Sequence, residues 1–185
     1  MPAFASAFPG HQQIPAGLAK DWRISSLREK LSELGYVIDG TFAQIKDAAN
    51  YGVPQRRRRL IVKASRLGVI SNPKPTSLKN TVREIIAKLP KPGASGDSLH
   101  DIVENRSEKV KNIISLVPKN GGSRSDIPKE FWLECHKRNE GSYRDVYGRM
   151  SWDDVAPTIT GGCHNPSTGR FIHPAQNRAI TLRAA

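Results

Sequence analysis

The chain has 185 residues, enough for one ordinary domain or for one and a half small ones. Lysine and arginine number 29 against 17 acidic residues, so the formal net charge is +12. This excess favours a polyanionic partner over an ordinary solvated surface. Nucleic acid is favoured over a membrane, because no apolar stretch approaches the roughly 20 residues that span a bilayer. The two cysteines exclude a disulfide framework and favour a reducing, cytoplasmic setting.

The first third of the sequence predicts one helix and two strands. Residues 1–24 lack periodicity and are expected to form an irregular lead-in. A capping box at Ser26–Glu29 predicts a helix that ends at Gly35, with leucines spaced along one face: Leu27, Leu31 and Leu34. Strands are predicted over 36–42 and 59–63, as an antiparallel pair at the end of an α/β sheet. One helix cannot cover both faces of such a sheet, so this region is expected to belong to a larger domain.

Beyond residue 65 the composition changes. Asn72–Pro75 has the composition of a linker. Two further helices are predicted, one opening at Thr81 and one at Ser107, because each capping residue precedes apolar residues at helical spacing. The remainder, from Lys119 on, is rich in glycine, proline, asparagine and arginine. It predicts a small, loop-dominated domain with a few strands.

A run of four arginines leads into the second predicted strand. It begins after Gln55 and comprises Arg56, Arg57, Arg58 and Arg59. Alternate side chains of an extended segment point to opposite faces, so Arg57 and Arg59 are expected to share one face. Guanidinium groups held in line fit phosphate oxygens or the acceptor edge of a base, because the planar fork binds two oxygens at once. Taken alone, the run could equally be a basic segment that only contacts solvent.

Several segments resemble the DNA cytosine-5 methyltransferases. Tyr51–Val62 closely resembles motif VIII of that family, whose core is Gln-x-Arg-x-Arg after Gly-Val-Pro. Gly169–Pro174 and Arg178–Arg183 look like motif IX. Between them, Tyr147–Trp152 and Pro157–Thr160 resemble parts of the target-recognition domain in the bacterial branch. The matching blocks follow the family's order and cover residues 31–65 and 115–183.

The resemblance implies an α/β fold. It would combine the terminal strands of an S-adenosylmethionine-dependent methyltransferase sheet with a small, mixed, loop-rich target-recognition domain. After the lead-in, residues 25–65 would form the distal part of the catalytic domain, including motif VIII. Residues 66–168 would form the target-recognition domain, and 169–185 the motif IX segment. The chain is therefore expected to be the C-terminal part of a bacterial, cytoplasmic enzyme.

The resemblance also implies a chemistry that this chain is not expected to perform alone. The family transfers a methyl group from S-adenosylmethionine to C5 of cytosine in duplex DNA, as restriction-modification enzymes do. A cysteine thiolate first adds to C6 of the flipped-out base. That cysteine lies in Pro-Cys-Gln and an assisting glutamate in Glu-Asn-Val, and Cys135 and Cys163 match neither motif. A glycine-rich cofactor loop and the closing glycine-asparagine motif are also missing from this sequence.

We therefore expect no catalytic residue in this chain. The nucleophile and the main S-adenosylmethionine site would belong to an N-terminal catalytic half, encoded in the same gene or present as a separate subunit. The alternative is a stand-alone basic DNA-binding module without catalytic activity. A neighbouring coding sequence with Pro-Cys-Gln and Glu-Asn-Val would distinguish the two.

The resemblance assigns roles to single residues. Arg57 is expected to contact the phosphate beside the flipped nucleotide, and Arg59 to reach O2 of the cytosine. Gln55 is expected to brace the loop. Thr158 and Thr160 fall at the recognition domain's threonine pair, which approaches the DNA near the target base. Ordinary strand residues are the alternative for both threonines.

The other candidate residues lie outside these two segments. Arg149 is counted among the DNA-binding residues, and Arg178 is expected to organise the motif IX segment. Sequence readout is expected from the variable region, 66–157, through side chains that address base edges. A metal site is not expected, because each adjacent Cys-His pair offers only one convenient ligand: Cys135–His136 and Cys163–His164.

Overall fold

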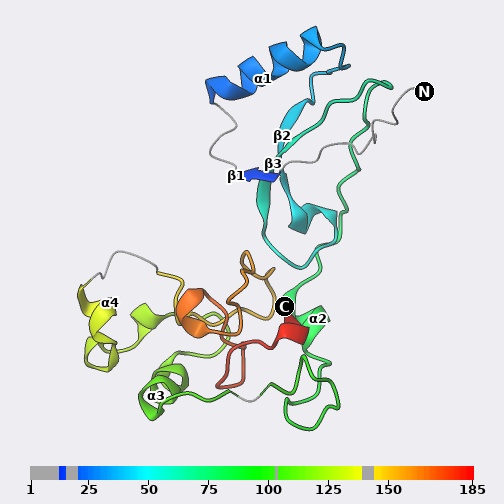
Figure 1. The fold of residues 1–185 in the computed structure, drawn as a ribbon. Helices are drawn as coiled ribbons and strands as arrows, with labels where there is room; N and C mark the ends of the chain where they lie inside the picture. The colour runs from blue at the N-terminus through cyan, green and yellow to red at the C-terminus, as the bar shows by residue number, and fades with distance from the viewer. Residues whose placement is uncertain (1–12, 16–20, 103, 139–143) are drawn as a thin grey trace. The chain divides into compact units, whose positions relative to one another are not determined.

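The computed structural model describes residues 13–15, 21–102, 104–138 and 144–185. The chain forms two compact units, both drawn in Figure 1. The first comprises Met1–Gly52 and Arg57–Leu78, and the second comprises Val53–Arg56 and Lys79–Ala185. The boundary expected after residue 65 therefore lies inside the first unit. No helix in the described ranges is long and apolar enough to cross a bilayer.

The first unit is built on a three-stranded antiparallel sheet with strand order β1-β3-β2. Its elements are β1 Gln13–Pro15, α1 Trp22–Glu33, β2 Ala43–Asp47, the 3-10 helix η2 Ala48–Tyr51 and β3 Arg58–Val62. The strand predicted over 59–63 corresponds to β3, which pairs antiparallel with β2 instead of with the strand predicted over 36–42. β1 lies in the region that was expected to be irregular.

The strand predicted over 36–42 is wrong. This stretch forms only an isolated bridge between Val37 and Ser65, and β2 begins at Ala43. The side chain of Asp39 accepts hydrogen bonds from the backbone N–H and the hydroxyl of Thr41, both at 2.7 Å. An aspartate that bonds its own backbone two residues on favours a turn over an extended chain.

Helix α1 begins four residues before the predicted capping box. The carboxylate of Asp21 accepts a hydrogen bond from the backbone N–H of Arg23 at 2.9 Å and so caps the helix. Ser26 consequently lies inside the helix. The predicted end is confirmed, because Leu34 is the C-cap and Gly35 adopts a φ of +77°.

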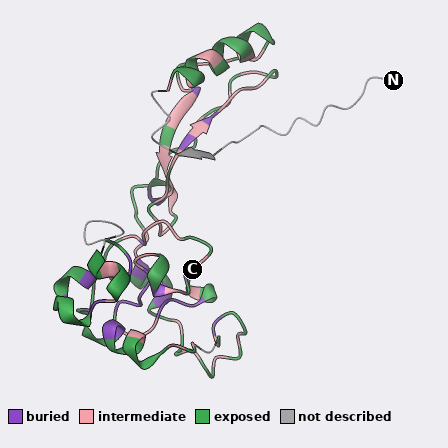
Figure 2. Cartoon of the chain, turned by 60° about the vertical axis from the view of Figure 1, so that its left-hand side comes forward, coloured by how far each residue is buried: buried purple, intermediate pink, exposed green. Residues whose placement is uncertain are grey.

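The core of the first unit lies on one face of the sheet. Leu60, Val62 and Phe42 are buried, and Ile24 and Leu31 of α1 pack against them. Figure 2 shows that most of α1 is nevertheless exposed, and none of its residues is buried. Because strand side chains alternate, Arg59 points away from the face that carries Leu60. The face with Arg59 therefore has no covering from α1.

The second unit contains the two predicted helices and otherwise consists mainly of loops. Its α-helices are α2 Val82–Ile86, α3 Glu108–Leu116 and α4 Glu134–Arg138, and its short 3-10 helices are Arg124–Asp126, Lys129–Phe131, Pro166–Thr168 and Leu182–Ala184. Thr81 is the N-cap of α2, and Ser107 caps α3 by accepting from the Val110 amide. In the described part of this unit, extended pairing is limited to isolated bridges.

Two apolar clusters stabilise the second unit. Ile113, Ile114 and Val117 of the α3 region pack with buried residues of the later loops: Ile127, Trp132, Val146, Tyr147 and Ile172. Val82 and Ile86 of α2 pack with Met150, Ala156, Cys163, Phe171 and Ile180. Both clusters thus join a helix to residues 146–180, which contain little regular structure of their own. Packing, rather than backbone pairing, holds these loops in place.

Candidate nucleic-acid interface

The arginine run follows a sharp corner at the end of β2. Asp47 caps η2, and η2 ends at Gly52, whose φ of +82° is a conformation that glycine adopts without strain. The backbone N–H of Ala48 donates to the carbonyl of Arg57 at 3.1 Å. The N–H of Arg57 donates in turn to Oδ1 of Asp47 at 2.9 Å. Both backbone polar groups of Arg57 are therefore bonded to the corner.

The residues just before Arg57 pair with a segment far along the chain. The N–H of Ala156 donates to the carbonyl of Pro54 at 2.9 Å, and the N–H of Arg56 donates to the carbonyl of Ala156 at 2.7 Å. The hydroxyl of Thr158 donates to the carbonyl of Arg56 at 2.8 Å, across 102 residues of sequence. These contacts lie within the second unit. The structure thus brings Gln55 and Thr158, two of the predicted site residues, into one short parallel pairing.

The face of β3 that lacks a helix is positively charged. In the register of β2 and β3, Lys46 lies opposite Arg59, and Asp47 lies opposite Arg58. Directly opposite residues of an antiparallel pair share a face, so Lys46 and Arg59 lie together, and Asp47 lies on the face of Leu60. One Nη1–H of Arg59 donates to the carbonyl of Arg58 at 2.8 Å. The remaining guanidinium donors of Arg59 make no hydrogen bond with any described residue.

The arginines of the run differ in their partners. Arg56 lies 3.8 Å from a carboxylate oxygen of Asp154, and both side chains are exposed. An exposed pair at this distance contributes little to stability, but it partly neutralises Arg56. Within the described part of the chain, Arg57, Arg58 and Arg59 form no ion pair. The charge available to an anion is therefore concentrated at the last three arginines.

The remaining residues predicted for this segment are placed as follows. Gln55 is half-buried, and its backbone N–H donates to the carbonyl of Val53 at 2.7 Å. Its side chain forms no hydrogen bond with a described residue, so the contacts of Gln55 to the loop are made by its backbone. Thr160 is exposed, and its hydroxyl makes no hydrogen bond in the described part of the chain. Thr160 can therefore contact a ligand without breaking an existing bond.

Arg149 is not part of this surface. It is fully buried, with 0% of its surface exposed. Its guanidinium donates to five oxygens at 2.6 to 2.9 Å: the carbonyls of Ile114, Val117, His173 and Gln176, and Oδ1 of Asn177. All five N–H donors are thereby used, and burial lowers the pKa of Arg149. The predicted DNA contact of Arg149 is wrong, because this side chain instead ties α3 to the segment after His173.

The buried imidazole beside Arg149 is neutral. His173 accepts hydrogen bonds at Nδ1 from the backbone N–H groups of Ala175 and Gln176, at 3.1 and 3.0 Å. Burial, with further contributions from Arg178, Arg149 and Lys119, lowers the pKa of His173 to about 4. A neutral ring is the form that can accept both bonds while Arg149 remains charged.

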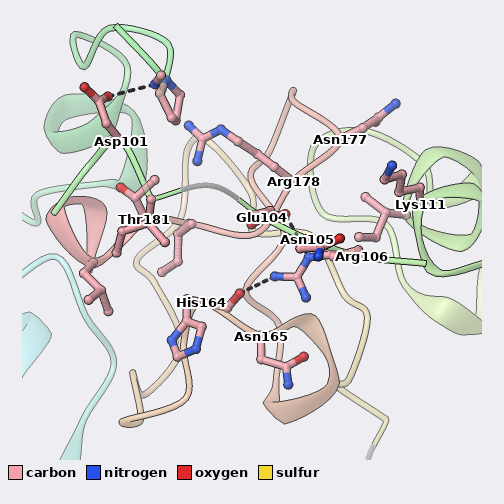
Figure 3. A pocket seen from close by; sticks show the side chains of 16 residues that line it. Asp101, Glu104, Asn105, Arg106, Lys111, His164, Asn165, Asn177, Arg178 and Thr181 are labelled. Atoms are coloured by element: carbon pink, nitrogen blue, oxygen red, sulfur yellow. Dashed lines mark hydrogen bonds and ion pairs between the residues drawn. The ribbon is translucent and has the colours of Figure 1, made fainter. Parts of the chain in front are cut away.

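Arg178 lies in the wall of a cavity of about 610 Å³ in the second unit. Figure 3 shows it beside Glu104 and Arg106. Arg178 donates to the Gln176 side chain at 2.6 Å and to the carbonyl of Ala179 at 2.9 Å. Glu104 accepts from the N–H of Ala179 and from Arg106, whose guanidinium reaches the carbonyl of His164. The cavity wall thus links residues 178–179 to the loop that follows Thr160.

The buried cysteine, Cys163, does not offer an activated thiolate. Cys163 is buried, and burial raises the pKa of its thiol, which disfavours the reactive form. Cys135 is exposed on α4. His136 beside it packs edge-on against Tyr147, with ring centroids 5.3 Å apart. Among the described residues, no group of three or more metal-ligating side chains is gathered closely enough to hold a metal ion.

Two residues of this region were missed by sequence reasoning. Asp47 precedes a short helical stretch that ends at Gly52, and this spacing is a detectable N-cap signal. Its bond to Arg57 has no sequence signal, because it depends on the fold of the corner. Asp154 likewise approaches Arg56 only through the pairing of their two segments. Neither contact with the arginine run could be read from the sequence, because each depends on how the chain folds back on itself.

The buried position of Arg149 generates a prediction. Lysine has one nitrogen and cannot serve five oxygens, so Arg149→Lys would leave several buried carbonyls without a partner. At roughly 1–3 kcal/mol for each unsatisfied group, partly relieved by relaxation, we expect a loss of about 2–4 kcal/mol in the free energy of unfolding. Urea denaturation followed by tryptophan fluorescence measures this free energy.

The matched control is Arg144→Lys at an exposed arginine, which is expected to change the free energy of unfolding by less than about 0.5 kcal/mol. Equal effects of both substitutions would contradict the role of Arg149.

Comparison with known proteins gives a consistent result. A family model described as C-5 cytosine-specific DNA methylase matches residues 20–185. The chain is 41% identical over 165 residues to the Type II methylase M.HgiDII of Herpetosiphon aurantiacus, a match that covers 85% of this chain and 45% of that protein. It is 32% identical over 164 residues to the Type II methyltransferase M1.HphI of Haemophilus parahaemolyticus, covering 86% and 40%.

A third relative is the Type II methyltransferase M1.BsuMI of Bacillus subtilis, strain 168. It is 30% identical over 175 residues, which cover 90% of this chain and 38% of that protein. The chain therefore spans less than half the length of these three relatives. The family match covers most of the sequence, including the arginine run and the segment that pairs with it. This chain belongs to the C-5 cytosine-specific DNA methylase family.

Proposed function

We propose that this chain is the DNA-binding and target-recognition part of a DNA (cytosine-5-)-methyltransferase of the restriction-modification type. It would hold duplex DNA while cytosine is methylated at C5. The observation that supports this role is the pairing of Pro54–Arg56 with Ala156–Thr158. These are the segments that resemble motif VIII and the threonine pair of the recognition domain. Their pairing joins a candidate phosphate-binding run to a candidate base-reading segment.

The charges of the arginine run support separate roles for its members. Arg57 would bind the phosphate beside the flipped nucleotide, because its guanidinium has no other anionic partner among the described residues. Arg59 would reach O2 of the cytosine, with Lys46 beside it adding positive charge to the same face. Gln55 would hold the loop through its backbone. Thr158 would position the loop, and exposed Thr160 would approach the DNA near the target base.

The residues present here do not fit the cofactor. A nucleoside cofactor needs a glycine-rich turn between a strand and a helix, where backbone N–H groups face the ligand. β2 leads into Ala48–Tyr51 and β3 into Ala64–Ser65, and neither connection is glycine-rich. S-adenosylmethionine would therefore be held mainly by other residues of the complete enzyme. The motif IX segment, with Arg178, would support the recognition domain.

The partner that supplies the nucleophile would contact the first unit. Large apolar side chains at α1 are exposed: Leu27 by 37% and the C-cap Leu34 by 58% lie along one side of the helix, and Trp22 by 75% lies at its start. A soluble helix normally turns such a stripe toward a core, and here the sheet covers only Ile24 and Leu31. An N-terminal catalytic half, in the same polypeptide or as a separate subunit, would cover this stripe and extend the sheet.

The lack of Pro-Cys-Gln and Glu-Asn-Val predicts that these 185 residues alone transfer no methyl group. Addition to C6 of cytosine has no candidate nucleophile here, since Cys163 is buried and Cys135 lies outside the expected motif. Incubation with tritium-labelled S-adenosylmethionine and cytosine-containing duplex DNA measures the transfer. Incorporation above that of a heat-denatured sample would contradict the assignment. A relative that carries both motifs serves as the positive control.

The arginine run predicts how this chain binds duplex DNA. Binding should be weak, with a dissociation constant on the order of 10⁻⁴–10⁻⁶ M, and its logarithm should change steeply with the logarithm of salt concentration. Arg57→Ala should reduce that slope by about one phosphate contact. Arg56→Ala is the matched control and should change affinity less than about threefold, because Asp154 already partly neutralises Arg56. Fluorescence anisotropy with a labelled duplex measures both quantities. A flat salt dependence, or equal effects of the two substitutions, would show that the run is only a solvated basic surface.

A further inference from the structure

The cavity that Arg178 lines lies wholly within the second unit. Its volume of about 610 Å³ falls in the range of roughly 300–1,000 Å³ that is typical of small-molecule sites. Two stretches that are distant in the sequence form its wall, one between residues 92 and 114 and the other between residues 164 and 182. No residue of the arginine run lines it. The cavity is therefore a candidate site of its own.

The charged side chains of the wall do not balance. Three are positive and two are negative: Arg106, Lys111 and Arg178 against Asp101 and Glu104. Nε of Arg106 lies 2.8 Å from Oε2 of Glu104, and only 16% and 26% of these two side chains is exposed. Glu104 also attracts Arg178, although burial is the larger effect and lowers the pKa of Arg178. One carboxylate thus serves two partly buried guanidinium groups, and an anion would complete the compensation.

The hydrogen bonds of the wall leave donors rather than acceptors. Arg106 and Arg178 each use two of their five N–H groups on described residues. The carboxylate of Asp101 already accepts four hydrogen bonds from the loop 93–96. Both oxygens of Glu104 also accept hydrogen bonds. A ligand of this wall must therefore supply acceptor oxygens, as a phosphate does.

The same wall carries exposed apolar side chains. Ile102 is 42% exposed and Leu182 is 41% exposed, and buried Ile114 and Ile180 lie in the wall with them. A flat ring placed against such side chains removes apolar surface from water. The side-chain amide of Asn105 forms no hydrogen bond with a described residue, so it can donate to and accept from the edge of a base. Inorganic phosphate would leave the apolar part unused, and a nucleoside would leave the arginines unused.

We propose that this cavity binds a single nucleotide. Its phosphate would lie against Arg106 and Arg178, with Lys111 in the same wall, and its base or sugar against Ile102 and Leu182. Two sources supply this chemistry: a free mononucleotide, or one nucleotide of a DNA strand. The inference rests on residues of the second unit alone and does not depend on DNA binding by the arginine run.

Calorimetric titration of the chain with deoxyadenosine 5′-monophosphate tests the site. We expect saturable binding, because this probe carries both an anion and a ring. Deoxyadenosine lacks the charge-assisted hydrogen bonds and should bind at least about tenfold more weakly. Inorganic phosphate lacks the ring and should also bind at least about tenfold more weakly. Absence of saturable binding, or equal affinity for the probe and either of its parts, would overturn the proposal.

Paired substitutions on α3 test the charge of the wall. Lys109 and Lys111 are exposed lysines of the same helix, but only Lys111 lines the cavity. Lys111→Ala should weaken binding of deoxyadenosine 5′-monophosphate about two- to fivefold, as expected for one exposed charge. Lys109→Ala is the matched control and should leave this affinity unchanged. Equal effects would show that the probe responds only to the general positive charge of the chain, which would contradict the proposal.

A second pair tests the apolar part of the wall. Ile102 and Leu116 have similar exposure, 42% and 37%, but only Ile102 lines the cavity. Ile102→Ser should weaken binding of deoxyadenosine 5′-monophosphate and of deoxyadenosine several-fold, and leave the affinity for inorganic phosphate unchanged. Leu116→Ser should change none of the three affinities. A loss of phosphate binding in Ile102→Ser would contradict the assigned contact.

Glu104 and Arg178 provide a test by the sign of the effect. Glu104→Gln keeps an acceptor oxygen but removes the negative charge, so deoxyadenosine 5′-monophosphate should bind up to about fivefold more tightly. Arg178→Gln should weaken the binding about tenfold or more. Damage to the fold can only weaken binding, so a gain identifies an electrostatic contact. Unchanged or weaker binding by Glu104→Gln would overturn the proposal. Should Arg178→Gln fail to unfold cooperatively in urea, the pairs at Lys111 and Ile102 still decide.

Competition with a short duplex distinguishes the two sources of the nucleotide. Displacement of bound deoxyadenosine 5′-monophosphate by the duplex, together with weaker duplex binding by Ile102→Ser, would assign the site to a nucleotide of DNA. Undisturbed binding of the probe would assign it to a free mononucleotide, and both results support the site. Failure of the titration itself would leave the proposed role of the arginine run unaffected, since none of its residues lines the cavity.

Discussion

The pairing of Pro54–Arg56 with Ala156–Thr158 is the interaction on which the functional account depends. Two backbone hydrogen bonds and one hydroxyl bond join segments that lie 102 residues apart in the sequence. Val53–Arg56 belong to the second unit, while Arg57 and β3 belong to the first. A short parallel pairing of this kind is weak alone and needs the surrounding apolar clusters to persist.

The buried and the exposed arginines of this chain differ in their partners because a guanidinium that is removed from water must find other hydrogen-bond acceptors. Arg149 is buried, and all five of its N–H groups donate to oxygens of its own chain. It therefore stabilises loops that lack regular structure. Among the described residues, Arg57 and Arg59 find no partner for most of their guanidinium donors, which remain solvated by water. A buried guanidinium without partners would be very costly, and an exposed one costs little. The same residue type therefore either organises the fold or remains available for a phosphate.

The sequence predicted the elements whose signals are local. Helix α3 was predicted from Ser107 and its apolar spacing, and β3 from its β-branched residues, because capping and periodicity act over a few residues. The start of α1 was missed because Asp21 and Ser26 both offer an N-cap, and only tertiary structure selects one. The fate of Arg149 could not be predicted, because its five acceptors come from segments distant in sequence. The motif resemblance identified the arginine run, but not the Asp47 and Thr158 bonds that hold it.

Chemical-shift mapping by NMR gives the sharpest test of whether the arginine run faces DNA. The isotope-labelled chain would be titrated with a short duplex, and the backbone and arginine side-chain signals followed. The account predicts the largest changes at Arg57, Arg59 and Thr160, with Arg149 unaffected. Changes confined to other basic residues, such as Lys109 and Lys111 of α3, with signals 57–59 unmoved, would contradict it.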